Sequence, residues 1–211
     1  MTIVSTILEA FEWFMRLVRL NLVFLLACLS GFVLFSFFPA IVAAFAVADQ
    51  WTKGNTDISV WKEFWKHFKA NYVRSQLVGY IIGLAVFIIY VDFTFFQQLD
   101  GGMIKTPIMM VLAILLLGIA ITALYIFPTL LTHDIKLKDL FRTSFFTGLS
   151  YIHWSMINLL GIVGILLVSY RFPGTLFFLT GSSIVLWMTC MNQIIKSKVE
   201  RRYEQLKSVA E

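Results

Sequence analysis

The sequence predicts an all-α, polytopic integral membrane helical bundle, and three observations support this fold class. The chain of 211 residues is 59% hydrophobic and 14% charged, whereas soluble domains average about 45–50% apolar and about 25% charged residues. Its mean hydropathy is +0.84. Its apolar residues gather in five runs, each near the roughly 20 residues that cross about 30 Å of hydrocarbon. Because the chain lacks polar residues to cover five such helices, lipid is the expected solvent.

Residues 2–19 predict an amphipathic helix at the membrane interface. Their apolar side chains share one helical face, and their charged side chains share the other. Glu12 and Arg16 form a favourable i,i+4 pair. The apolar run that follows is longer than the roughly 7–15 residues of a signal-peptide core, so we do not expect a cleaved secretory signal.

Five transmembrane spans follow, and with the first helix they form a single domain over residues 1–195. We expect the first span to end or kink at Pro39. The apolar stretch 40–48 then lies in the interface, re-enters the membrane or lengthens the first helix. Residues 196–211 form a charged tail. The expected spans are 20–38, 77–96, 107–127, 153–170 and 175–195.

Two polar connections between spans predict amphipathic helices at residues 58–72 and 137–149. The first starts near Asp57, a plausible N-cap. Aromatic side chains form a stripe along it with lysines beside them, which suits a helix at the headgroup level or against a partner. We expect both helices to form one contiguous interaction surface. The candidate interface residues are Trp61, Lys62, Trp65, Lys66, Phe68, Lys138 and Phe141.

The lysines and arginines predict an orientation, because cytoplasmic loops carry an excess of them. Five spans place the termini on opposite sides. Thirteen of the 17 basic residues then share the side of the C-terminus, against Arg16, Arg19, Lys105 and Arg171. We therefore expect a cytoplasmic C-terminus and an external N-terminus. The net charge of +5 fits an anionic membrane surface better than nucleic acid.

Polar residues inside the spans are candidates for function. Asp92 is the only acidic residue within a predicted span, and an intramembrane carboxylate is a functional hypothesis by default. The alternative is a structural ion pair with Arg19 or Arg16. Asn158, like Asn21, is expected to make an interhelical hydrogen bond.

Gly79 and Gly83 form a GxxxG pattern, which lets two helices approach closely. We expect the partner to be another span of this chain, and self-association is the alternative.

No catalytic, cofactor or metal signature is present in the sequence. It contains no G-x-S-x-G, HExxH, Walker A or paired-carboxylate pattern. His67, His133 and His153 lack partners at metal-ligand spacing. Cys28 and Cys190 lie in apolar runs and are expected to act as small buried hydrophobes. We expect neither an enzyme nor a bound cofactor or metal.

A weak internal repeat relates the two halves. Phe38-Pro39 precedes the first amphipathic helix and its span, and Phe127-Pro128 precedes the second. Parallel repeats occur in transporters, but duplication of a packing unit also produces them.

Several segments between Leu20 and Gly83 share a distinctive order and spacing. They are Leu20-Asn21-Leu22, Gly31–Phe35, Phe38-Pro39-Ala40, Ala43-Ala44-Phe45, Trp51–Gly54, Asp57, Lys62–Trp65, Phe68–Tyr72 and Ser75-Gln76. In this order they resemble the YesL-like family of bacterial membrane proteins, closely over the first 85 residues and collinearly over the rest. The resemblance implies a multi-span protein of the bacterial cell membrane. It further implies an accessory role beside a carbohydrate ABC importer, with importer subunits or a second copy as partners. The alternative is a small solute transporter or channel.

Overall fold

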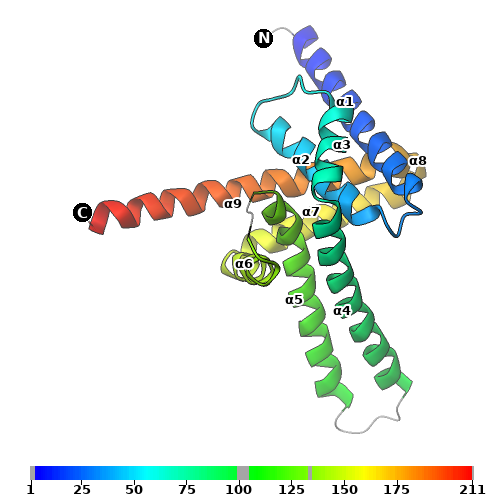
Figure 1. Ribbon diagram of the computed structural model, residues 1–211, viewed down its shortest axis with the longest axis vertical. Coiled ribbons are helices and arrows are strands. Elements are labelled where there is room, and N and C mark those ends of the chain that lie inside the picture. The colour runs from blue at the N-terminus through cyan, green and yellow to red at the C-terminus, as the bar shows by residue number, and fades with distance from the viewer. Residues whose placement is uncertain (1–2, 99–104, 133–134, 211) are drawn as a thin grey trace.

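The computed structural model describes the backbone of residues 3–98, 105–132 and 135–210, and the regular elements in these ranges are all helices (Figure 1). Five of them are long and apolar enough to cross a membrane. This confirms the predicted fold class and indicates a multi-pass membrane protein. The elements are α1 (Ile3–Ser30), α2 (Phe37–Thr52), α3 (Val60–Ala70), α4 (Tyr72–Gln98), α5 (Lys105–Thr132), α6 (Leu137–Ser150), α7 (Ile152–Arg171), the short α8 (Pro173–Thr175), the π-helical turn η1 (Leu176–Thr180) and α9 (Gly181–Ala210).

The first span differs from its prediction. The expected interfacial helix and the start of the span are one continuous helix, α1, which ends at Ser30 rather than near Pro39. The chain then turns and returns as α2, whose Trp51 ring lies 6.1 Å from that of Trp13. The stretch 40–48 belongs to α2 and is almost wholly buried. It therefore neither lengthens the first helix nor lies open at the interface.

Helix α2 occupies the centre of the bundle. It contacts α1, α3, α4, α5 and α9, and its many alanines let these neighbours approach closely. The ring of Phe38 stacks on Phe127 of α5 at 6.2 Å. It also fills the space where a side chain at Gly79 of α4 would stand.

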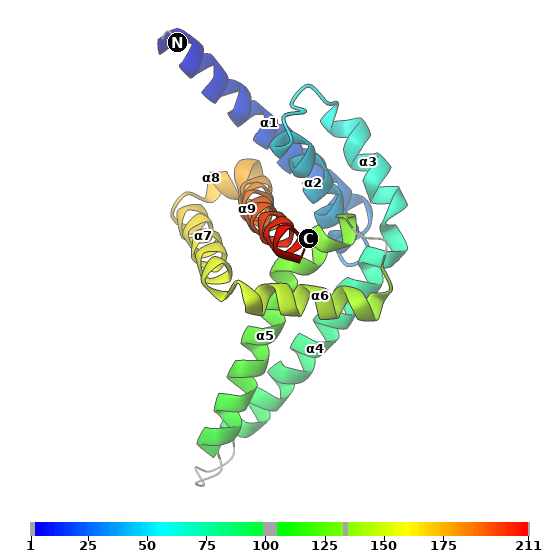
Figure 2. The same cartoon turned by 90° about the vertical axis from the view of Figure 1, so that its left-hand side faces the viewer.

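Helices α4 and α5 form a hairpin that projects away from the other helices (Figures 1 and 2). The end of α4 and the start of α5 lie close together, as the hydrogen bond from Lys105 Nζ to the Gln97 carbonyl at 2.9 Å shows. Most side chains of α4 beyond Gly83 are not covered by protein. In a membrane protein such apolar surface faces lipid.

The last hairpin consists of α7 and α9, joined through α8 and η1. The Ser169 and Thr180 hydroxyls are hydrogen-bonded at 2.6 Å. Asn21 of α1 is buried and holds the π-helical turn, since its Nδ2 donates to the Phe177 carbonyl at 2.7 Å. Its Oδ1 accepts from the Ser182 backbone N–H at 3.1 Å. This is the interhelical hydrogen bonding that was expected for Asn21.

Candidate functional site

Helix α3 positions the first candidate surface. It starts at Val60 with Ser59 at the N-cap, so the predicted cap Asp57 lies before the helix. Glu63 lies in its first turn and Lys69 in its last, and both charges suit the helix dipole. Its inner face buries Phe64 within the core, and α3 packs mainly on α2.

The outer face of α3 carries aromatic and basic side chains together. Trp61 is 52% exposed, and the centroid of its ring lies 5.8 Å from that of Trp65. Lys62, Lys66 and Lys69 are exposed and with the two tryptophans border one shallow hollow. We call these five residues the α3 hollow.

The α3 hollow carries positive charge. Lys66 Nζ lies 3.1 Å from Glu63, and His67 lies 3.0 Å from the same carboxylate. Partial burial of Glu63 raises its pKa, but the hydrogen bonds and charges of Lys66 and His67 outweigh this, so its pKa is lowered overall. Lys62 and Lys69 form no ion pair with any residue that the structure describes.

The structure divides the predicted aromatic stripe. Phe68 is only 7% exposed and packs in the core with Phe64, so it cannot contact a partner. Trp65 is partly buried, and only Trp61 stands well clear of the protein. The aromatic stripe was too broad a prediction because part of it packs into the core of the bundle.

The second amphipathic helix does not join the α3 hollow. In α6, Lys138 is exposed and Phe141 is half-buried against the core, but neither borders the hollow. Helix α6 packs mainly on α5, whereas α3 packs on α2 and α1. The two regions are linked where the Arg74 guanidinium, after α3, donates to the Ile135 carbonyl, before α6. The expected contiguous surface is therefore not formed by these candidates.

The expected pairing of Asp92 with an arginine is not found. Arg16 instead lies 3.4 Å from Glu12, and Asp92 forms no ion pair with another described residue. Arg19 lies on α1 between Trp13 and Phe24, which both contact α2. Asp92 lies in the last turns of α4, whose hairpin with α5 projects away from the other helices (Figures 1 and 2).

The remaining candidates divide between packing and open surface. Gly79 is buried against Phe38, as expected for a contact within the chain, but a side chain at Gly83 would meet no atom.

Asn158 is 0% exposed, and its backbone carbonyl accepts from Trp187 Nε1 at 3.3 Å. Its side-chain amide has no hydrogen-bond partner among the described residues, so the expected interhelical bond is not seen there.

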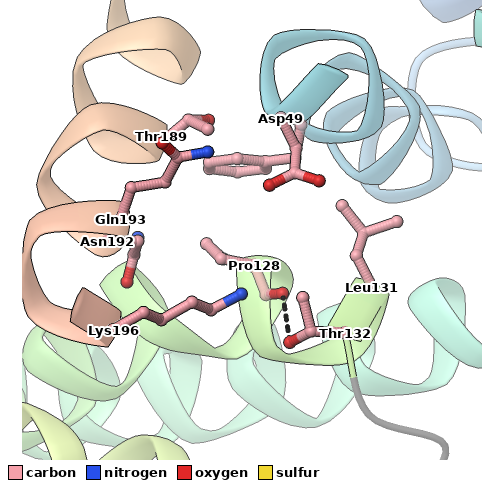
Figure 3. A pocket seen from close by; sticks show the side chains of 9 residues that line it. Asp49, Pro128, Leu131, Thr132, Thr189, Asn192, Gln193 and Lys196 are labelled. Atoms are coloured by element: carbon pink, nitrogen blue, oxygen red, sulfur yellow. Dashed lines mark hydrogen bonds between the residues drawn. The ribbon is translucent and has the colours of Figure 1, made fainter. Parts of the chain in front are cut away.

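Sequence reasoning missed a small pocket, lined by both polar and apolar side chains, where α2, α5 and α9 meet (Figure 3). Asp49 enters it from α2, Thr132 from α5, and Asn192, Gln193 and Lys196 from α9. Its volume of about 20 Å³ is room for one water molecule. The pocket escaped detection because its members come from helices far apart in sequence.

A larger cleft of about 380 Å³ adjoins this pocket between α5, α6 and α9. Side-chain hydroxyls dominate its polar lining. Within the described residues, no group of three or more His, Cys, Asp or Glu could hold a metal ion. The polar residues of this cleft include Thr129, Thr132, Thr143, Thr147, Asn192 and Lys196.

Comparison with known proteins connects this architecture to a family. Residues 17–93 match the family model described as "Protein of unknown function, DUF624". The chain is 32% identical over 196 residues to the uncharacterized protein YesL of Bacillus subtilis (strain 168), covering 93% of this chain and 92% of YesL. It is 29% identical to YteU of the same organism over 82% of this chain and 77% of YteU. No solved structure gives a significant match. The identity to YesL over nearly the whole of both chains shows that this protein belongs to the YesL-like DUF624 family.

Proposed function

We propose that this chain is a non-enzymatic accessory membrane protein that docks a partner protein through the α3 hollow. The observation that carries this proposal is the exposure of Trp61 beside Lys62 and Lys69 on a helix whose inner face is fixed in the core. A helix anchored in this way presents its outer side chains at little further entropic cost, which favours binding.

The chemistry of the α3 hollow selects an acidic partner segment. Tryptophan is enriched among the residues that dominate binding at protein interfaces. The lysines around it favour a negatively charged surface and would speed its approach. The family resemblance points to a carbohydrate ABC importer as the partner, so its membrane subunits are the proteins to look for.

Charge reversal at the hollow tests this proposal. The protein is purified in mild detergent as the wild type, as Lys62→Glu/Lys69→Glu and as the charge-preserving control Lys62→Arg/Lys69→Arg. Co-purifying proteins are then quantified. We expect importer subunits with the wild type and the arginine control, and at least a tenfold loss with the glutamate variant. Added salt should weaken the complex because it screens exposed charges.

Equal recovery of importer subunits with the glutamate variant and the wild type would contradict docking through the hollow. Recovery of none with any form would contradict an importer as the partner. The double variant should still fold, since both lysines are exposed and form no ion pair with a described residue. An unchanged elution volume in size-exclusion chromatography checks this.

The second candidate function is transport of a small polar solute, favoured by the cleft between α5, α6 and α9. Its volume of about 380 Å³ lies within the range of small-molecule sites. Thr143→Val with Thr147→Val would remove two of its hydroxyls with little change in volume. Under this alternative, solute uptake should fall while co-purification of protein partners stays unchanged.

A further inference from the structure

The apolar helices of this chain pair into antiparallel hairpins. In the first, Trp13 of α1 lies beside Trp51 of α2, with ring centroids 6.1 Å apart. At the other end Phe24 lies beside Phe37, at 6.2 Å. The start of α1 and the end of α2 therefore lie at the same end of this hairpin.

The second and third hairpins have the same form. The Arg74 guanidinium donates to the Ile135 carbonyl at the open end of α4 and α5, and Lys105 reaches Gln97 at the closed end. In α7 and α9, Lys198 Nζ lies 4.2 Å from the centre of the Trp154 ring. The closed end of that hairpin is marked by the hydroxyl pair described above.

The first hairpin has the composition of a membrane segment. No charged residue occurs from Leu20 to Ala48, a stretch that contains the end of α1, the turn and most of α2. The 16 residues of α2 span about 24 Å at 1.5 Å per residue. This falls short of the roughly 30 Å of hydrocarbon. Helix α1 alone is long enough to cross, but the hairpin can be no deeper than its returning arm α2, and this depth fits a re-entrant segment.

The turn between α1 and α2 is also suited to lipid. Each backbone N–H from Phe32 to Phe37 donates a hydrogen bond within the chain. The Leu34 carbonyl accepts from Gln76 Nε2 at 2.9 Å. The side chains of residues 32–35 are all apolar and exposed. Irregular backbone at membrane depth requires such internal hydrogen bonding, because lipid provides none.

We infer that α1 and α2 form a re-entrant membrane hairpin, so that both termini lie on the cytoplasmic side with α3 and α6. Each hairpin returns the chain to the side from which it started. Under this arrangement 15 of the 17 lysines and arginines lie on the cytoplasmic side, and only Lys105 and Arg171 lie on the other. The positive-inside rule favours this distribution over the 13 of a five-span arrangement.

This inference replaces the expected external N-terminus and does not depend on the proposed function. It gives Arg16 and Arg19 the same environment as the lysines of α3. Lys62 in the first turn of α3, Lys138 in the first turn of α6 and Lys196 and Lys198 of α9 then share the side of Arg16 and Arg19, toward the anionic headgroups of the cytoplasmic leaflet. The five-span expectation treated residues 20–38 as one span, whereas the turn at residues 31–36 divides this apolar run between α1 and α2.

Cysteine labelling in intact cells tests the inference on the full chain. Cys28 and Cys190 are replaced by alanine, and single cysteines are introduced at Thr6, Asn55 and Gly174, all exposed. A membrane-impermeant maleimide should label Gly174→Cys in intact cells. It should label Thr6→Cys and Asn55→Cys only after permeabilisation. A cytoplasm-specific fluorescent reporter fused ahead of Met1 of the otherwise wild-type chain should be fluorescent.

Two outcomes would overturn the inference. If Thr6→Cys and Asn55→Cys lie on opposite sides, α1 and α2 do not form a returning hairpin and the five-span arrangement stands. If both are labelled in intact cells, the hairpin stands but its cytoplasmic assignment is wrong. The reporter fusion keeps the test decisive should a cysteine variant fail to accumulate.

Discussion

The contact between Asn21 and the π-helical turn should be a main stabilising feature of the bundle. Asn21→Leu keeps the side-chain volume nearly constant but removes the bonds to the Phe177 carbonyl and the Ser182 N–H. Interhelical hydrogen bonds in membrane proteins contribute roughly 0.6 kcal/mol each and up to about 1.7 kcal/mol. Two such bonds predict a loss of about 1–3 kcal/mol in the free energy of unfolding.

The assay is reversible unfolding in mixed micelles, with Asn192→Leu as the matched control. Asn192 is also a buried amide, but its Nδ2 donates to the Met188 carbonyl of its own helix at 2.9 Å. Its replacement should therefore destabilise less. Equal destabilisation by the two substitutions would refute the view that Asn21 joins α1 to the last span.

A second pair of variants tests the same contact from the opposite side. A side chain at Gly181 would place its Cβ 2.7 Å from Asn21 Oδ1. Gly181→Ala should therefore destabilise the wild type and have a smaller effect in an Asn21→Ala background, where that oxygen is absent. Strict additivity of the two substitutions would contradict direct coupling.

Further expected outcomes concern helix packing and charge. Gly79→Ala should destabilise by about 1–3 kcal/mol through overpacking, because its Cβ would lie 2.1 Å from the Phe38 ring; thermal unfolding should show Gly83→Ala to be nearly neutral. The lowered pKa of Glu63 means that its carboxylate stabilises the folded protein. This contribution to the free energy of unfolding is fully present above the ordinary pKa of 4.5. It is lost as the pH falls through the pKa that Glu63 has in the folded state. When the free energy of unfolding is measured against pH, the Glu63→Gln variant should not show this loss of stability in acid. Asp92→Asn should change the unfolding free energy by less than about 0.5 kcal/mol, and a larger loss would indicate a partner for this carboxylate.

The fold class could be predicted from the sequence because lipid solvation requires a composition that soluble domains lack. The turn of the first hairpin could not be predicted in this way. Residues 31–36 contain one glycine and one serine among large apolar side chains, so the usual polar turn signals are missing. The left-handed backbone at Phe32 and Val33, with φ of 52° and 56°, is rare for such residues and is not visible in composition.

Only part of the candidate site could be predicted from the sequence. Helical periodicity identified the aromatic face of α3 and the lysines beside it. It could not show that Phe68 would be buried while Trp61 stays exposed, because α3 packs on α2 and α2 was not recognised as a separate helix. The cleft between α5, α6 and α9 depends on contacts across long sequence separations, which a single sequence does not report.

Site-specific photocross-linking at the α3 hollow tests its role in docking most directly. A photoreactive amino acid replaces Lys62 or Lys69 in the full chain in living cells. The matched control carries it at Phe178, an exposed side chain of the π-helical turn. The account predicts a protein adduct containing an importer membrane subunit at both lysine positions and only lipid adducts at Phe178. Only lipid adducts at Lys62 and Lys69 would contradict it and would assign the hollow to the membrane surface.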